Sequence, residues 1–241
     1  MINLLTYTDP SKKFASEEDK IMAKIQIDNA LELGWKREDI LIATDFPYEY
    51  NGVKSVIVED KNPITWNLTQ GKIVAITDLF AKGLIKEGEL YWFHDFDAFQ
   101  LEPFTEADLG MSGFDVGFTN SGREMINGGS FFFNHKTADI FEWILNCIYT
   151  IRPDAHGFDE QMGFAQLVTT GELNMKARYK MMDHTYNLGV VNSRRFQENY
   201  NLAQKPIRVA HFHPHKKHHL EVFRDILPDR IMKIFQKYGI Q

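Results

Sequence analysis

The feature that most constrains the fold is a run of four large apolar residues, Leu90-Tyr91-Trp92-Phe93, which leads into two carboxylates one residue apart. Such a run predicts a buried strand, with Asp95 and Asp97 at or just beyond its end. Neighbouring carboxylates repel each other unless a cation offsets their charge, and the hard ions Mn²⁺ and Mg²⁺ prefer oxygen ligands. Because open α/β sheets bind ligands beyond the carboxyl ends of their strands, the run predicts a metal site at the edge of a sheet. The alternative is an ordinary polar strand end.

The composition limits the classes of protein to which this strand can belong. The chain has 241 residues, 44% hydrophobic and 25% charged, as expected of a soluble globular protein with one large α/β domain or two small ones. The net charge of −6 argues against non-specific binding to nucleic acid. No stretch approaches the roughly eighteen apolar residues of a membrane span. The single cysteine, Cys147, cannot form an internal disulfide, and the N-terminus lacks the features of a signal peptide, so we expect a cytoplasmic protein.

The first hundred residues alternate between predicted strands and helices. Apolar runs and helical spacing predict, in order, a strand over 2–7, a helix over about 16–34, strands over 40–44 and 53–58, a turn at 60–63, a helix over about 67–85, and the strand that carries the two carboxylates. This alternation predicts a mostly parallel central sheet flanked by helices.

The second half of the chain is less regular. The pattern predicts strands over 115–119, 130–134 and 207–212, a loop at 120–123, a turn at 127–129, and helices from Ala138, over 158–168, over 220–226 and over 229–238. The segment 175–187 fits no single type of element. We see no repeat and no domain linker, so we expect one domain over residues 1–241.

A cluster of histidines and lysines follows the last predicted strand. Residues 211–219 contain five of the nine histidines and two lysines of an otherwise acidic chain. One interpretation is a third metal ligand from His211 or His213, with Lys216 or Lys217 reaching phosphate oxygens. The alternatives are a solvated loop and a zinc-binding loop.

Three further segments allow both a structural and a functional interpretation. The two glycines of Asn127-Gly128-Gly129 let the backbone approach a ligand closely, or form a hairpin turn, and both can be true. Asp159 and Glu160 either open a helix, where acids suit the dipole, or place a carboxylate in the site to orient sugar hydroxyls or act as a base. Lys72 is either solvated or part of the site.

Taken together, these residues resemble a known family. The apolar strand followed by Asp95-Phe96-Asp97 resembles the Asp-x-Asp motif of the GT-A-fold, nucleotide-sugar-dependent glycosyltransferases, in which it holds Mn²⁺ or Mg²⁺ on the donor diphosphate. His211-Phe212-x-x-x-x-Lys217 is similar to the His-Phe-x-Gly-x-x-Lys motif of the glycogenin-like and bacterial galactosyltransferase-like family. The pattern also resembles small glycosyltransferases of large DNA viruses. It spans residues 2–217.

The resemblance implies roles for individual residues. His211 corresponds to the third metal ligand and Lys217 to the diphosphate contact. Pro214 stands where the family has glycine, so His213 competes as the ligand. The resemblance further implies that Thr6, Tyr7 and Thr8 contact the donor nucleoside and that Lys72 contacts the donor. It places Asn127, Gly128 and Gly129 near the donor sugar and the acceptor. Asp159 or Glu160 takes the position of the family's Asp-Gln segment.

The resemblance also implies an activity. It predicts a metal-dependent hexosyl- or pentosyltransferase that moves a sugar from a nucleoside-diphosphate sugar, with a UDP-sugar favoured, to a hydroxyl of a glycan or other acceptor. Retention at the anomeric carbon is favoured over inversion. The nucleotide-binding half covers about residues 1–100, and the acceptor and metal-loop half covers about 101–241. The rival functions are an Asp-x-Asp phosphohydrolase, which the late position of the motif and Phe99 oppose, and a non-catalytic sugar- or metal-binding protein.

Overall fold

A central mixed sheet organises the protein. The computed structural model describes residues 1–9, 17–59, 71–120, 126–151, 158–189 and 193–240. Eight strands form the sheet in the order β3 (Glu49–Tyr50), β4 (Val53–Ile57), β2 (Ile40–Thr44), β1 (Ile2–Tyr7), β5 (Leu90–His94), β8 (Ile126–Asn134), β7 (Val116–Asn120) and β9 (Tyr179–Met182). Strands β4, β2, β1 and β5 run parallel, as predicted for the first half. Strand β8 then runs antiparallel to both of its neighbours, so the sheet is mixed.

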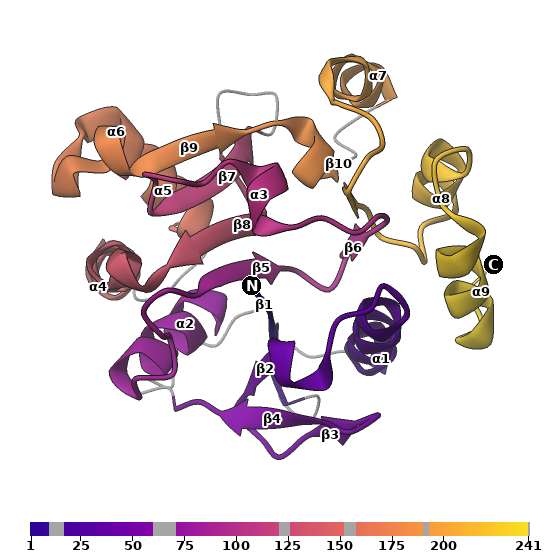
Figure 1. Ribbon diagram of the computed structural model, residues 1–241, viewed down its shortest axis with the longest axis horizontal. Helices are drawn as coiled ribbons and strands as arrows, with labels where there is room; N and C mark the ends of the chain where they lie inside the picture. The colour runs from indigo at the N-terminus through magenta and orange to yellow at the C-terminus, as the bar shows by residue number, and fades with distance from the viewer. Residues whose placement is uncertain (10–16, 60–70, 121–125, 152–157, 190–192, 241) are drawn as a thin grey trace.

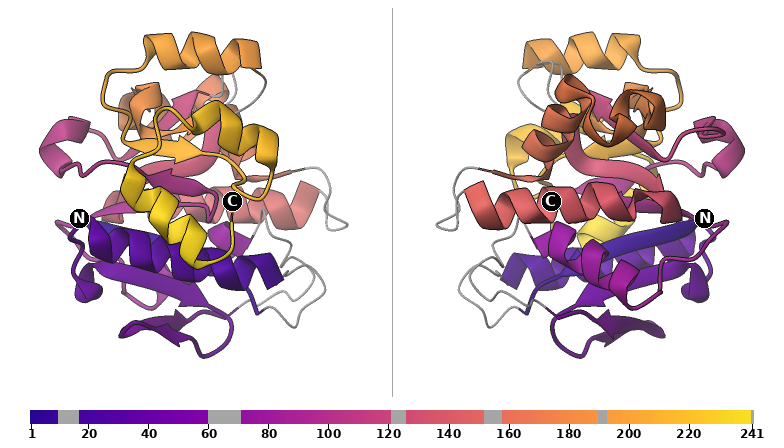
Figure 2. Two further views of the ribbon diagram at one scale, coloured as in Figure 1. Left: turned by 90° about the vertical axis from the view of Figure 1, so that its right-hand side faces the viewer. Right: turned by 90° about the vertical axis from the view of Figure 1, so that its left-hand side faces the viewer.

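Helices cover both faces of this sheet. On one face lie α2 (Gly71–Ala81), α4 (Ala138–Ile151) and α5 (Glu160–Thr170), and on the other lies α1 (Glu17–Glu32); α9 (Asp229–Lys237) packs on the outer side of α1 (Figures 1 and 2). Successive side chains of a strand point to opposite faces of the sheet. Phe93 of β5 belongs to the core under α2 and α4, whereas Trp92 packs on the opposite face. The fully buried aromatic run therefore joins two cores, as its continuous apolar character predicted.

A second, smaller sheet lies beside the carboxyl end of β5. It consists of β10 (Leu188–Gly189), β11 (Val209–His211) and β6 (Ala98–Gln100), in that order. Strand β11 pairs antiparallel with β6 and parallel with β10. The small sheet thus brings the last third of the chain against the segment that carries the two carboxylates (Figure 1).

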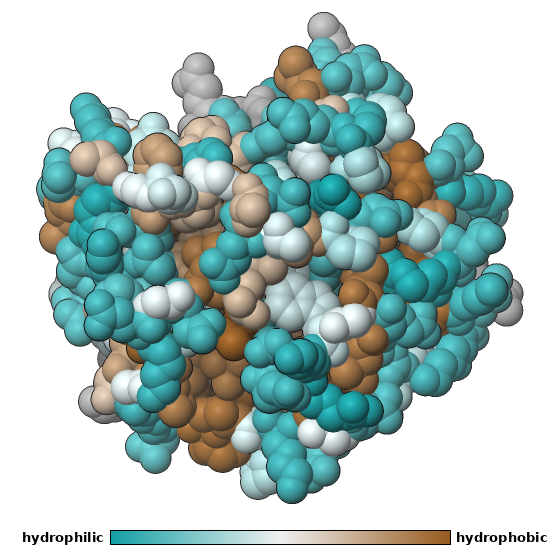
Figure 3. Space-filling view, viewed as in Figure 1, coloured by the Kyte–Doolittle hydropathy of each residue, from teal (hydrophilic) through white to brown (hydrophobic). Residues whose placement is uncertain are grey.

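The remaining elements are short. They are the helices α3 (Glu106–Leu109), α6 (Met175–Arg178), α7 (Ser193–Leu202) and α8 (Lys217–Phe223), and the 3₁₀ turns Arg37–Asp39, His135–Thr137, Glu172–Asn174 and His184–Tyr186. None of the helices within the described ranges combines the length and apolar character needed to cross a membrane. The face seen in Figure 3 is largely hydrophilic, with apolar patches between the polar groups.

Several predicted boundaries need correction. The predicted turn at Asn127-Gly128-Gly129 is wrong, because these residues lie inside β8, opposite an irregularity in the register of β7 between Phe118 and Thr119. The last strand covers only Val209–His211, and α8 begins three residues earlier than expected. Helix α7 was not predicted. The predicted turn at 60–63, the loop at 121–123 and the expected beginnings of the helices at 16 and 67 lie outside the described residues.

Candidate functional site

Backbone hydrogen bonds fix the two carboxylates at the end of β5. The N–H of Asp95 donates to the carbonyl of Gly129 in β8 at 2.8 Å, and the N–H of Ala98 donates to the carbonyl of Asp95 at 3.0 Å. The chain therefore turns sharply between β5 and β6. The N–H of Phe212 donates to the carbonyl of Asp97 at 2.8 Å, and His211 lies opposite Ala98 in the small sheet. Strand pairing thus places the first histidine of the C-terminal cluster beside the second carboxylate.

Three side chains converge at this turn. One ligand atom each from Asp95, Asp97 and His211 lies within 4.8 Å of the other two, and Nε2 of His211 is 3.2 Å from Oδ1 of Asp97. Two carboxylates and one imidazole are suitable donors for Mn²⁺, and a site with an open side can take further oxygen ligands from phosphate or water. The residues therefore fit the predicted divalent ion.

His213 lies on the other side of the same carboxylate. Its Nδ1 is 3.3 Å from Oδ2 of Asp97, but its side chain is more exposed than that of His211. Burial alone would raise the pKa of Asp97, but the two histidines outweigh it and hold the pKa of Asp97 below its usual range. Burial alone would lower the pKa of His211, and Asp97 reverses that effect and raises it. The two histidines therefore flank Asp97, one beside each carboxylate oxygen.

The two glycines of β8 are required by close contacts rather than by backbone angles. A Cβ atom at Gly129 would lie 2.1 Å from Cε1 of His211, and one at Gly128 would lie 2.4 Å from Oε1 of Glu160. Neither distance is sterically possible without displacing the neighbour. The glycines therefore create the space in which the histidine ring and the glutamate side chain pack against the strand.

Beneath the carboxylates lies a buried ion pair network. Nζ of Lys72, on the first turn of α2, is 2.8 Å from Oδ1 of Asp95 and 2.9 Å from Oε1 of Glu160, and it donates to the carbonyl of Gly128 at 3.3 Å. The side chains of Lys72 and Glu160 are 4% and 2% exposed. Burial would lower the pKa of Lys72, but the two carboxylates raise it, so this lysine is charged. Burial raises the pKa of Glu160 despite the lysine, and Oε2 of Glu160 has no hydrogen-bond partner among the described residues.

Asp159 has a different role. Its side chain accepts a hydrogen bond from the N–H of Met162 at 2.9 Å, which caps the first turn of α5. Capping of the helix is therefore sufficient to explain an acid at Asp159. Glu160, in contrast, points into the buried network.

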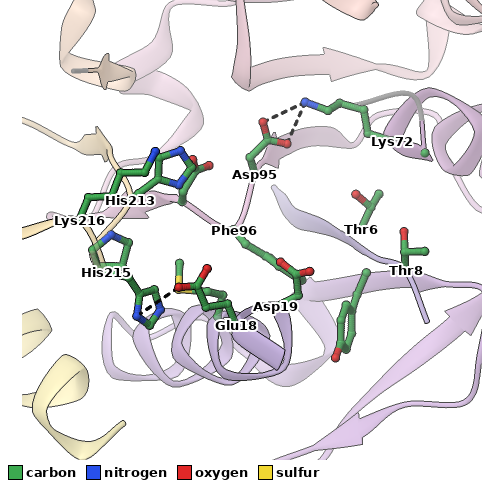
Figure 4. A pocket seen from close by; sticks show the side chains of 15 residues that line it. Thr6, Thr8, Glu18, Asp19, Lys72, Asp95, Phe96, His213, His215 and Lys216 are labelled. Atoms are coloured by element: carbon green, nitrogen blue, oxygen red, sulfur yellow. Dashed lines mark hydrogen bonds and ion pairs between the residues drawn. The ribbon is translucent and has the colours of Figure 1, made fainter. Parts of the chain in front are cut away.

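A cavity of about 470 Å³ opens at this turn, and two of the three converging side chains, Asp95 and Asp97, line it (Figure 4). This volume lies within the roughly 300–1,000 Å³ that is typical of small-molecule sites. Its walls come from five parts of the chain: Thr6, Tyr7 and Thr8 at the end of β1; Glu18, Asp19 and Met22 of α1; Gly71 and Lys72 of α2; Asp95, Phe96 and Asp97 after β5; and His213, Pro214, His215 and Lys216. The predicted nucleoside contacts, Lys72 and the two carboxylates thus line one space.

Lys217 does not line this cavity. Its side chain is 87% exposed, and its Nζ is 3.9 Å from Glu221, one turn further along α8. Lys216 lines the cavity wall instead, beside His213 (Figure 4). The motif spacing indicated Lys217, whereas Lys216 lines the cavity, because α8 begins at Lys217 and successive side chains at the start of a helix point in different directions.

Helix α1 contributes residues that were not predicted. Nε2 of Gln26, a buried residue, donates to the carbonyl oxygens of Phe96 and Ala98 at 2.6 and 3.2 Å and so holds the turn between the carboxylates. Glu18 lies 3.7 Å from His215 across the cavity mouth (Figure 4). The available signal was a glutamine among the apolar residues Met22, Ile25 and Ile27, because a buried amide requires partners.

The fold and the converging side chains define a class: the protein has the GT-A fold of glycosyltransferases. The galactosyltransferase LgtC, solved in complex with donor and acceptor sugar analogues, superimposes with a TM-score of 0.61 at 11% identity, over 98% of this chain and 96% of that one. A glycosyltransferase involved in the glycosylation of the major capsid of PBCV-1 gives 0.56 at 14% identity, over 98% of both chains. The glycosyltransferase GlyE of Streptococcus pneumoniae TIGR4 gives 0.56 at 11% identity, over 100% and 65%. The sequence matches no protein-family model and no curated protein.

Proposed function

We propose that this protein is a metal-dependent glycosyltransferase that moves a sugar from a nucleoside-diphosphate sugar to a hydroxyl of a glycan or other acceptor. The observation that carries the proposal is the convergence of Asp95, Asp97 and His211, of which Asp95 and Asp97 line the cavity. The GT-A fold supports it, because LgtC, which shares this fold, is solved with donor and acceptor sugar analogues.

Asp95, Asp97 and His211 would hold the divalent ion, Mn²⁺ or Mg²⁺, with His213 as the competing ligand. The ion, when bound, supplies positive charge that stabilises a departing diphosphate. We assign the lysine contact to the diphosphate to Lys216 in place of Lys217, since Lys216 lines the cavity. An ammonium at this wall binds phosphate oxygens by charge-assisted hydrogen bonds.

The cavity wall formed by Thr6, Tyr7 and Thr8 is the proposed site of the donor nucleoside. It lies across the cavity from His213, His215 and Lys216, with Asp95 between the two walls (Figure 4). A donor that spans this distance would have its nucleoside at the end of β1 and its diphosphate at the carboxylates. A UDP-sugar remains the favoured donor, and residues 1–100 the proposed nucleotide-binding half.

Glu160 is the proposed acid at the sugar end of the site, and Asp159 caps its helix. Oε2 of Glu160 is buried and has no hydrogen-bond partner among the described residues, so this acid keeps an unused acceptor. Asn127, Gly128 and Gly129 form the backbone beside it. The ammonium of Lys72 already donates to Asp95, Glu160 and the carbonyl of Gly128. Its proposed role toward the donor is therefore indirect: it holds the two carboxylates in place and offsets their charge. Transfer of a hexosyl or pentosyl group with retention is the proposed chemistry.

Calorimetry followed by turnover tests this proposal. We expect nucleoside diphosphates to bind in the presence of Mn²⁺ and not after chelation, and the intact donor sugar to appear on an acceptor or on water by mass spectrometry. Release of inorganic phosphate from phosphomonoesters would favour the phosphohydrolase. Binding without any consumption of a panel of nucleotide sugars, acceptors included, would favour a non-catalytic binding protein.

A further inference from the structure

The geometry points to Asn187 as a positioning residue that presents Nε2 of His211 to the metal. This inference rests on the proposed metal-dependent function. It concerns a residue outside the cavity, whose carboxamide lies behind the histidine ring.

The contact is made on the far side of the ring from the carboxylates. Oδ1 of Asn187 is 3.1 Å from Nδ1 of His211, while Nε2 of the same ring is 3.2 Å from Oδ1 of Asp97. The ring also packs so closely on the backbone of Gly129 that a Cβ there would overlap it. The histidine is therefore held on three sides: by the strand beneath it, by Asn187 behind it and by Asp97 in front.

The oxygen of Asn187 selects one form of the neutral ring. An imidazole carries its proton on either Nδ1 or Nε2, and a metal can bind only the nitrogen that has none. A carboxamide oxygen accepts a hydrogen bond and cannot donate one, so it favours the proton on Nδ1. The lone pair of Nε2 then faces Asp97 and the proposed ion, which is the arrangement that outer partners of metal-bound histidines generally enforce.

The backbone fixes Asn187 in this place. The residue is 2% exposed, and its own N–H donates to the carbonyl of His184 at 3.2 Å. It directly precedes β10, where Gly189 lies opposite His211 in the parallel pair of the small sheet. The register of that sheet therefore sets the distance between the carboxamide and the ring.

The other half of the carboxamide supports a role for its oxygen. Nδ2 of Asn187 is buried and has no hydrogen-bond partner among the described residues. An unpaired buried donor is unfavourable for folding, so stability alone does not account for an asparagine at this position. The contact from Oδ1 to His211 does account for it.

The test compares three variants with the wild type. Asn187→Asp keeps an acceptor toward Nδ1, whereas Asn187→Leu has a similar size and no acceptor, and Asn187→Ala also removes the acceptor without added bulk. Asn199→Leu is the matched control, since Asn199 is a buried asparagine in α7 that lines no part of the site. Mn²⁺ binding without nucleotide is measured by electron paramagnetic resonance, and folding by circular dichroism.

We expect Asn187→Leu and Asn187→Ala to weaken Mn²⁺ binding by about 10- to 100-fold, the usual effect of losing an outer partner of a metal ligand. Asn187→Asp should bind at least as tightly as the wild type, and Asn199→Leu should be unchanged.

Two outcomes would overturn the inference, and they differ. If the wild type binds Mn²⁺ and a folded Leu or Ala variant binds it equally well, Asn187 has no positioning role, although the proposed function stands. If the wild type binds no Mn²⁺ at all, the metal-dependent function fails and this inference fails with it. Should Asn187→Leu not fold, Asn187→Ala decides the matter by the same measurement.

Discussion

Replacing Lys72 by Met should destabilise the protein strongly, because it removes the cation that balances a buried acid. Nζ of Lys72 is 2.9 Å from Oε1 of Glu160, and both side chains are almost completely buried. Two unit charges 4 Å apart attract each other by about 4 kcal/mol at an effective dielectric constant of about 20. Asp95 is 32% exposed, so solvent screens its contact with the lysine and we add little for it.

The loss should therefore be about 3–5 kcal/mol in the free energy of unfolding, the usual cost of leaving one partner of a buried ion pair alone. Urea unfolding followed by circular dichroism measures it. The control is Lys54→Met, since Lys54 and its partner Glu49 are both exposed and the loss of this pair should cost less than about 1 kcal/mol.

The double variant Lys72→Met, Glu160→Gln provides the sharper test. Removing both charges leaves no unpaired ion, so the double variant should be more stable than Lys72→Met alone. The single variant should also depend on pH. Burial already raises the pKa of Glu160, and loss of the lysine raises it further. The folded state then binds more protons than the unfolded state, so stability falls as pH rises above the ordinary range of a glutamate.

A Lys72→Met protein that unfolds within about 1 kcal/mol of the wild type at pH 8 would refute this reasoning. The same conclusion would follow if the double variant were less stable than the single one. Either result would mean that water or a rearranged side chain offsets the charge of Glu160 once the lysine is gone. The ion pair network would then be accessible to water.

Three further predictions concern the site. Asp97→Asn should abolish Mn²⁺-dependent binding of a nucleoside diphosphate with the circular dichroism spectrum unchanged, and unchanged affinity in calorimetry would remove this residue from the metal site. Gly129→Ala should displace the ring of His211, because the new Cβ would lie 2.1 Å from it; its Mn²⁺ affinity should fall far more than its melting temperature, and an unaltered affinity would contradict the close contact. Lys216→Ala should weaken nucleoside diphosphate binding by about 1.5–3 kcal/mol, the value of a hydrogen bond to a charged group, and leave the free nucleoside unaffected; Lys217→Ala is its control, and equal effects of the two would contradict the assignment to Lys216.

The elements with strong local signals were predictable from the sequence. The strands 2–7 and 40–44 have the predicted bounds, and the run Leu90–Phe93 is fully buried. Their apolar residues are consecutive, so burial and extended backbone follow from the sequence itself. The small sheet was harder, because β6 and β10 have three and two residues and are specified by pairing with β11 rather than by their own composition.

The errors at the site have the same origin. The glycines at 128 and 129 indicated a turn, but they face Glu160 and His211, which come from distant parts of the chain. Sequence spacing carries no information on such a contact. Lys216 and Lys217 are equivalent in composition, and the start of α8 separates them. Asn187 gave no signal at all, because its partner is a histidine in another strand.

The pairing of β6 with β11 also has a consequence during synthesis. The carboxylates at 95 and 97 leave the ribosome long before residue 211, and at about 5–20 residues per second the interval is about 6–23 s. Throughout that time the nascent chain has its two acids and no strand beside β6. The cluster of three side chains that could hold an ion is therefore complete only late in synthesis, after β11 has paired with β6.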